Sequence, residues 1–165
     1  MTKRRKEQIQ SETPAQYGAD SDQAIIDRAL QILSARIGEP GQAITSPGDT
    51  KSFLTLQLAE RKNEAFCSIW LDNRHRVLSF EVLFTGTIDG ASVHPRVVVQ
   101  RAMAVNAAAV IFAHNHPSGL AEPSGADKAI TTRLIQALEY VDVRVLDHVI
   151  VGGMSTFSFA ERGLL

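Results

Sequence analysis

The sequence is poor in cysteine, has no excess of charge of either sign and contains no long apolar run. Its one cysteine, Cys67, cannot form an internal disulfide, so the fold has no disulfide framework. Lysine and arginine number 17 and aspartate and glutamate 18, and the resulting net charge of -1 gives no electrostatic reason to expect nucleic acid or an anionic membrane as a partner. No segment has the length and hydrophobicity of a signal peptide or a membrane span, so we expect a cytoplasmic protein with no membrane partner.

Length and composition, with 44% hydrophobic residues among 165, predict one globular domain with a tail. Residues 1–20 are basic and polar and lack an apolar period, so we interpret them as a disordered arm. Residues 21–45 are interpreted as an N-terminal helix and linker. Asp22 can cap that helix, and its apolar stripe runs to Ile37, so we expect one face of it to be buried. Residues 46–165 form the main domain.

Helix and strand signals alternate along the rest of the chain. The segment Ser46-Pro47-Gly48-Asp49 combines a cap residue, a proline at the first helical position and an acid three residues after the cap, which predicts a helix start. Two apolar runs joined by a polar turn predict a hairpin, and a later apolar run predicts a buried strand followed by polar side chains. The expected order is ααββαβαββ, without an internal repeat: helices over 22–37, 46–62, 95–106 and from 124, and strands over 64–71, 77–84, 107–113, 143–151 and around 157–159.

Two histidines, a serine and an aspartate lie within fourteen residues of one another, at His114, His116, Ser124 and Asp127. Side chains at positions i and i+2 of an extended segment point the same way, so both histidines can reach one metal ion, and a carboxylate from the next element can complete the set. Three protein ligands leave a position for water, which favours hydrolysis over a structural zinc site. Ser124 and Asp127 also fit a helix capping box, and both interpretations hold if Asp127 faces the histidines from the first turn.

The run H-N-H-P-S-G, with Ser124 eight residues after His116 and Asp127 three further on, resembles the JAMM motif of JAB1/MPN domains. The segments NEAFCSIWLD, FTGTIDGASVHPR, AHNHPSGLAEPSGAD and LDHVIVGG are similar to the bacterial RadC branch of that family, and the resemblance covers roughly residues 46–165. It implies an α/β fold of the MPN/JAB (cytidine-deaminase-like) type, a curved mixed sheet flanked by helices. It also implies that His114, His116 and Asp127 bind Zn²⁺, and that Ser124 polarises the substrate carbonyl or holds the bound water.

The resemblance further implies an upstream glutamate as general base. By its place at the start of the first strand of the hairpin, Glu64 is our candidate, and Glu81 on the second strand is the reserve. A carboxylate at the mouth of a strand stays near solvent and can take a proton from zinc-activated water. We therefore expect a zinc-dependent hydrolase that cleaves a peptide or isopeptide bond in a protein or peptide substrate.

A second hypothesis is a non-catalytic adaptor, stapled by zinc and linked to DNA repair or mobile-element functions. RadC relatives carry an N-terminal helix-hairpin-helix region, whereas here one helix and a basic arm precede the main domain, so DNA binding has weak support. An HNH nuclease spreads its three residues over separate elements, and zinc nucleobase deaminases need a P-C-x-x-C segment, which one cysteine cannot supply. The oligomeric state stays open. Asp147-His148 either orients a metal ligand from behind or makes a structural hydrogen bond.

Overall fold

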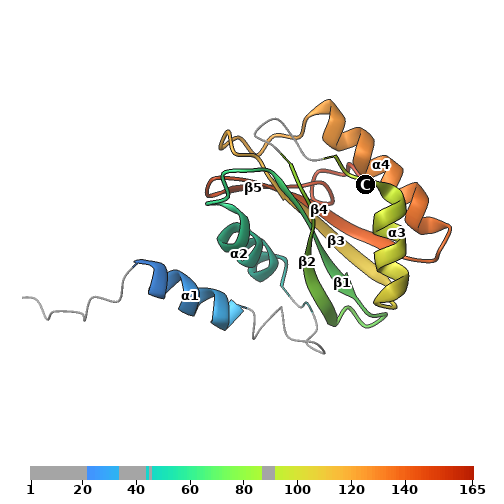
Figure 1. The fold of residues 1–165 in the computed structure, drawn as a ribbon, viewed down its shortest axis with the longest axis horizontal. Helices are drawn as coiled ribbons and strands as arrows, with labels where there is room; N and C mark the ends of the chain where they lie inside the picture. The colour runs from blue at the N-terminus through green and yellow to red at the C-terminus, as the bar shows by residue number, and fades with distance from the viewer. Residues whose placement is uncertain (1–21, 34–43, 45, 87–91) are drawn as a thin grey trace, which may run out of the picture.

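A single mixed sheet with helices on both faces organises the chain in the computed structural model, which describes residues 22–33, 44, 46–86 and 92–165 (Figure 1). The expected arm over residues 1–20 lies outside the described residues, as does the predicted continuation of the first helix to Ile37. The expected α/β class and the order ααββαβαββ are both confirmed. The elements are α1 (Asp22–Leu33), α2 (Pro47–Leu58), β1 (Ala65–Leu71), β2 (Val77–Thr85), α3 (Pro95–Ala104), β3 (Ala109–Asn115), α4 (Gly125–Glu139), β4 (Arg144–Gly152) and β5 (Ser155–Ser158).

The strand order in the sheet is β2-β1-β3-β4-β5. The predicted hairpin of β1 and β2 is antiparallel, β1 also runs antiparallel to β3, and β3 lies parallel to β4. The crossover from β3 to β4 passes through α4, as a parallel pair requires. This topology places β3 at the centre of the sheet, so its end is flanked by the start of β1 and by the end of β4.

Two hydrophobic cores lie on opposite faces of the sheet. Alternate residues of β1 divide between them, because successive side chains of a strand point to opposite faces. Cys67 and Ile69 pack with Leu54 of α2, and Phe66 and Trp70 pack with residues of α3 and α4. Burial raises the pKa of the Cys67 thiol to about 12, so this side chain is an apolar core group at neutral pH.

The predicted start of α2 is confirmed, but its end is four residues earlier than expected. Ser46 is the N-cap, and its hydroxyl accepts a hydrogen bond from the backbone N–H of Asp49 at 3.3 Å. The helix was expected to reach about Lys62 and ends at Leu58. The backbone carbonyl groups of Arg61 and Asn63 instead accept hydrogen bonds from the side chain of Asn115, so this stretch is held in a turn that leads into β1.

The expectation that α1 buries an apolar face is wrong for the residues described. None of its residues is buried, and Ile25 and Ile32 are 57% and 47% exposed. The stripe of Ile26, Leu30 and Leu33 is only half-buried, and Leu33 packs against the core formed by α2 and the sheet. Figure 1 shows α1 next to α2 and away from the sheet, so among the described elements none covers the exposed side chains of Ile25 and Ile32.

The central strand lies two residues further along the chain than the predicted range of 107–113. Asn106 has φ of 53° and ends the turn after α3, so β3 begins only at Ala109. His114 and Asn115 therefore belong to the strand, and the backbone N–H of His116 continues the ladder by donating to Val151 O at 2.8 Å.

The helices that the structure describes include none long and apolar enough to cross a membrane.

Candidate metal centre

The two histidines of the H-N-H run lie at the carboxyl end of β3 and point to the same side of the sheet, as predicted. Their Nε2 atoms are 3.0 Å apart. His114 is almost completely buried at 1% exposure, whereas His116, one residue beyond the strand, is partly open to solvent. The centre thus has a closed side in the core and an open side at the sheet edge.

Asp127 approaches the histidines from the first turn of α4. Its Oδ1 atom lies 3.2 Å from Nε2 of His114, and its Oδ2 atom lies 3.5 Å from Nε2 of His116. The capping box is also present: Ser124 Oγ accepts from the backbone N–H of Asp127, while Asp127 Oδ2 accepts from both the backbone N–H and the hydroxyl of Ser124. Both interpretations of the Ser124–Asp127 pair therefore hold together, because the cap uses Oδ2 and leaves Oδ1 free for the histidine side.

These three residues fit a metal ion. His114, His116 and Asp127 offer ligand atoms that all lie within 4.8 Å of one another. Ligands at about 2.0–2.1 Å from a tetrahedral zinc ion are about 3.3 Å apart. The separations of 3.0 Å between the two Nε2 atoms and 3.2 Å between His114 Nε2 and Asp127 Oδ1 are close to that value.

The electrostatics of the centre favour a positive charge among the three side chains. Burial alone would raise the pKa of Asp127, but hydrogen bonds with His114, His116 and Ser124 outweigh it and hold this pKa far below its usual range. The hydrogen bond with Asp127 raises the pKa of His116, and the charge of Glu64 adds to the effect. Protons and a metal ion compete for the same space in such a cluster.

His116 is oriented by a backbone carbonyl group. Its Nδ1 atom lies 2.7 Å from Leu120 O, and because a carbonyl oxygen can only accept, Nδ1 carries a proton and donates it. In neutral His116 the lone pair is therefore on Nε2, which faces His114 and Asp127. Gly152 at the end of β4 leaves room for this loop. A Cβ atom at that position would lie 2.4 Å from Ala121 N and 2.5 Å from Leu120 C, so the loop could not approach β4 as closely.

A Gly152→Ala substitution should weaken metal binding although it changes none of His114, His116 and Asp127, which we call the metal set. The new methyl group must push the Leu120–Ala121 backbone away, so the carbonyl group that orients His116 moves with it. We expect the zinc Kd to rise about tenfold or more, the range found when the partner that orients a metal ligand is lost. Gly125→Ala is the matched control, because a Cβ atom there meets nothing within 4 Å. Equal zinc affinities of the two variants in a competition titration would contradict this role of Gly152.

Ser124→Ala should reduce both stability and metal affinity. Loss of an N-cap hydroxyl costs about 1 kcal/mol of folding free energy, and Asp127 Oδ2 loses the hydroxyl donor that holds it. Ser46→Ala removes the N-cap hydroxyl of α2 in the same way but far from the metal set. Urea denaturation should show similar losses of stability for both variants, and zinc titration should show weaker binding only for Ser124→Ala. A weaker zinc complex in the Ser46→Ala variant as well would attribute the effect to stability.

Glu64, the predicted general base, immediately precedes β1 at the same edge of the sheet. Phe66, two residues after Glu64, pairs with His114 in the register of β1 and β3, and the negative charge of Glu64 contributes to the raised pKa of His116. Asn115 fixes this segment: its Oδ1 atom accepts from the backbone N–H of Ala65 at 2.9 Å, while its Nδ2 atom donates to the two carbonyl groups that end the α2–β1 turn. No sequence pattern predicted a role for Asn115, yet its side chain connects the Glu64 segment to the strand that carries the histidines.

Glu81, the reserve candidate, is engaged elsewhere. Its carboxylate accepts from Arg101 Nε at 2.5 Å and from Arg101 Nη2 at 2.8 Å, and from the Ser79 hydroxyl at 2.7 Å. These hydrogen bonds and the arginine charge lower the pKa of Glu81, which weakens it as a base. Its register partner in β1 is Ser68, two residues further from the sheet edge than Phe66.

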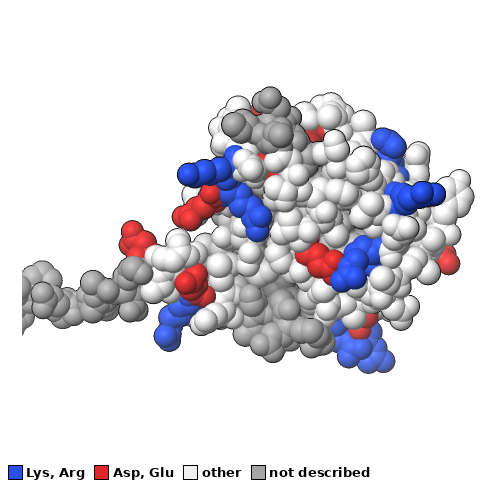
Figure 2. All heavy atoms as spheres, in the orientation of Figure 1, with Lys and Arg blue, Asp and Glu red and all other residues white. Residues whose placement is uncertain are grey.

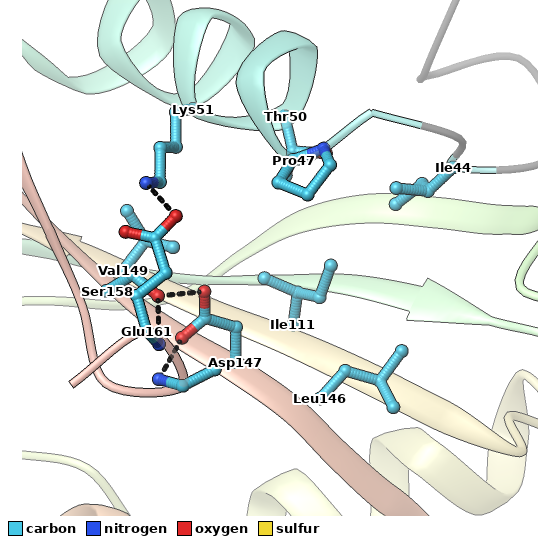
Figure 3. Close-up of a pocket in the computed structure, with 11 residues that line it drawn as sticks. Ile44, Pro47, Thr50, Lys51, Ile111, Leu146, Asp147, Val149, Ser158 and Glu161 are labelled. Carbon is cyan, nitrogen blue, oxygen red and sulfur yellow. Dashed lines mark hydrogen bonds and ion pairs between the residues drawn. The ribbon is translucent and has the colours of Figure 1, made fainter. Parts of the chain in front are cut away.

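The Asp147–His148 pair is divided between the two faces of the sheet. His148 points to the metal set, where its Nε2 atom lies 2.8 Å from His114 Nδ1, and burial lowers its pKa well below the usual value. Asp147 points to the other face and lines a pocket of about 230 Å³ (Figure 3). There it accepts hydrogen bonds from Ser158 Oγ at 2.6 Å and Ala160 N at 3.0 Å. The contacts are thus compatible with both interpretations, because His148 touches His114 from behind and Asp147 makes structural hydrogen bonds.

Comparisons with known proteins agree with this geometry. A UPF0758 protein of Thioalkalivibrio sulfidiphilus is 60% identical over 143 residues, which are 87% of this chain and 63% of that protein. A UPF0758 protein of Nitrosococcus oceani is 63% identical over 125 residues, 76% of this chain and 56% of the relative. UPF0758 protein YkfG of Escherichia coli K12 is 52% identical over 144 residues, 87% of this chain and 91% of the relative.

The chain therefore spans roughly three fifths of the length of the first two relatives and most of the third, and the names of all three state no activity. Residues 44–164 match the family model described as the RadC-like JAB domain, and this range contains the whole metal set and both candidate bases. The match over most of the chain, with a mixed sheet that brings two histidines and an aspartate together at its edge, shows that the chain belongs to the RadC-like JAB domain family.

Proposed function

We propose that this protein is a zinc-dependent hydrolase of the JAMM type that cleaves a peptide or isopeptide bond. One observation carries the proposal. On the RadC-like JAB fold, His114 Nε2 lies 3.0 Å from His116 Nε2 and 3.2 Å from Asp127 Oδ1, and the pKa of Asp127 is far below its usual range, so its carboxyl group is ionised. Unprotonated, these nitrogen and oxygen lone pairs repel one another, so a metal cation between them would stabilise the cluster.

His114, His116 and Asp127 would hold the metal ion. A zinc ion so bound lowers the pKa of a coordinated water to about 7 and polarises a carbonyl group. Nitrogen and carboxylate ligands without a thiolate suit zinc in a catalytic setting, although the same ligand types also bind iron or manganese. The preference for zinc therefore also rests on the family.

Glu64 would supply the proton transfers. Glu64 immediately precedes β1, at the end of the sheet where the histidines lie. It would take a proton from the attacking water and return that proton to the leaving amine. Ser124 would donate to the substrate carbonyl oxygen, and for that its hydroxyl must turn away from Asp127 Oδ2, to which it donates at 2.6 Å in this structure. The backbone N–H of Ser124 then remains as the capping donor to this carboxylate.

A protein or peptide is the proposed substrate, and DNA has little support among the residues described. On the face drawn in Figure 2, lysine and arginine side chains alternate with aspartate and glutamate and form no continuous basic patch in the described part. Among the described residues, oppositely charged side chains also form ion pairs, as in Lys51–Glu161 and Arg101–Glu81. A cytoplasmic location is likewise proposed on the expectation from the sequence.

Removal of the metal tests the proposal most simply. Zinc-loaded protein should cleave members of a mixed peptide library, lose that activity after treatment with a chelator, and regain it on addition of one equivalent of zinc. Mass spectrometry of the library identifies the cleaved bonds, and a peptide branched through a lysine side chain tests the isopeptide alternative. Bound zinc without any cleavage would favour the zinc-stapled adaptor.

A further inference from the structure

A chain of buried polar side chains runs behind His114, on the side away from the metal set. His114 Nδ1 lies 2.8 Å from Nε2 of His148 on β4, and Nδ1 of His148 lies 2.6 Å from Thr131 Oγ1 in α4. Thr131 Oγ1 also lies 2.6 Å from the backbone carbonyl oxygen of Asp127. Thr131 and His148 are 1% and 0% exposed. The chain thus connects one residue of the metal set to another through two residues that do not belong to it.

The carbonyl group at one end fixes the direction of every hydrogen bond in the chain. A carbonyl oxygen can only accept, so at 2.6 Å the single hydroxyl proton of Thr131 must be donated to Asp127 O. Thr131 Oγ1 then offers only lone pairs to the imidazole on its other side. His148 Nδ1 must therefore carry a proton and donate it to Thr131.

The surroundings of His148 leave its second nitrogen without a proton. The ring stacks on Phe159 at a centroid distance of 4.9 Å and meets Phe66 edge-on at 5.4 Å, and it is fully enclosed. A charged imidazole is costly in such a place, so His148 is neutral and its bare Nε2 accepts a hydrogen bond from the N–H group at His114 Nδ1. Neutral His114 then has its lone pair on Nε2, the atom that faces His116 and Asp127.

We propose that Thr131 and His148 are positioning residues that hold His114 in the tautomer protonated at Nδ1 and thereby present its Nε2 lone pair to a cation. This inference rests on the proposed metal function and extends it to two residues that touch neither metal nor substrate. Partners that orient a metal-binding histidine typically contribute 10–100-fold to metal affinity. The same chain connects the orientation of His114 to the backbone of Asp127 in α4.

Variants at Thr131 test the chain against a closely matched control. Thr131→Val removes the hydroxyl that fixes His148 and should raise the zinc Kd about 10–100-fold, while Thr131→Ser keeps the hydroxyl and should stay near the wild-type value. Thr55 of α2 is also buried and donates in the same way to the carbonyl group four residues earlier, Lys51 O at 2.8 Å, on the opposite face of the sheet. Thr55→Val should therefore lower stability without changing zinc affinity. Equal zinc affinities for Thr131→Val and Thr55→Val would overturn the proposal.

A spectroscopic experiment tests the tautomers without metal or activity. Nitrogen-15 NMR of histidine-labelled, metal-free protein should show protons on Nδ1 of both His114 and His148 and no proton on Nε2 of His148, with His148→Phe used to assign the signals. A proton on His148 Nε2 would overturn the inference. Failure of the wild type to bind zinc would instead contradict the proposed function. The two failures can be told apart, because the NMR measurement uses metal-free protein and does not depend on zinc binding.

Discussion

Replacing His116 by alanine is expected to abolish stoichiometric zinc binding. The wild-type protein should bind one zinc ion per chain, whereas the variant retains only His114 and Asp127 of the three converging groups. Two ligands hold zinc far more weakly than three, so zinc measured by elemental analysis after dialysis should fall from about one equivalent to near zero. The fold should survive, because His116 lies beyond β3 and is partly exposed.

Asp127→Asn and His75→Asn complete this experiment. The first keeps the size of the side chain but removes the charge that the histidines share, so it should lose zinc as well. The second removes a histidine from the β1–β2 turn, at the opposite end of the sheet, where φ of 58° suits asparagine. It should keep a full equivalent of zinc. Undiminished zinc in folded His116→Ala protein would show that the ion binds elsewhere.

Glu64→Gln is expected to leave zinc in place and to reduce peptide cleavage by about 10²–10⁴-fold, the usual contribution of a general base. Glutamine matches glutamate in size and keeps the hydrogen bond that Gly86 N donates to the backbone carbonyl group of residue 64. It cannot take a proton, however. Cleavage should be measured at saturating zinc, with the zinc content of both proteins determined in parallel.

Glu81→Gln is the matched control, since it carries the same change at the other candidate base. It breaks the ion pair with Arg101 at the protein surface and should leave cleavage within about twofold of wild type, because exposed ion pairs contribute little. Loss of activity in Glu81→Gln together with full activity in Glu64→Gln would reverse the assignment. Full activity of both variants would exclude a carboxylate base at either position.

The parts of the fold that sequence predicted well are those with a local cause. Caps and prolines set the starts of α2 at Pro47, α3 at Pro95 and α4 at Gly125, each within a residue of the expected place. The i, i+2 spacing of His114 and His116 and the capping box at Ser124 are equally local, so the convergence of the metal set followed from them and from the family resemblance.

The parts that sequence did not predict depend on partners far along the chain. The early end of α2 and the segment that leads into β1 depend on hydrogen bonds with Asn115, which lies 50 and 54 residues after its partners Ala65 and Arg61. The role of Gly152 depends on a close approach of the Leu120–Ala121 backbone, and that of Thr131 depends on His148. An asparagine inside a buried strand is a usable signal, because both ends of its amide group need partners, but the sequence does not say which.

Anomalous X-ray diffraction at the zinc absorption edge, from crystals of the zinc-loaded protein, would locate the ion itself. We expect one strong peak per chain bounded by His114 Nε2, His116 Nε2 and Asp127 Oδ1, each about 2.0–2.2 Å from the ion. A peak at any other place, or no peak in crystals of protein saturated with zinc, would exclude a zinc site formed by these three residues.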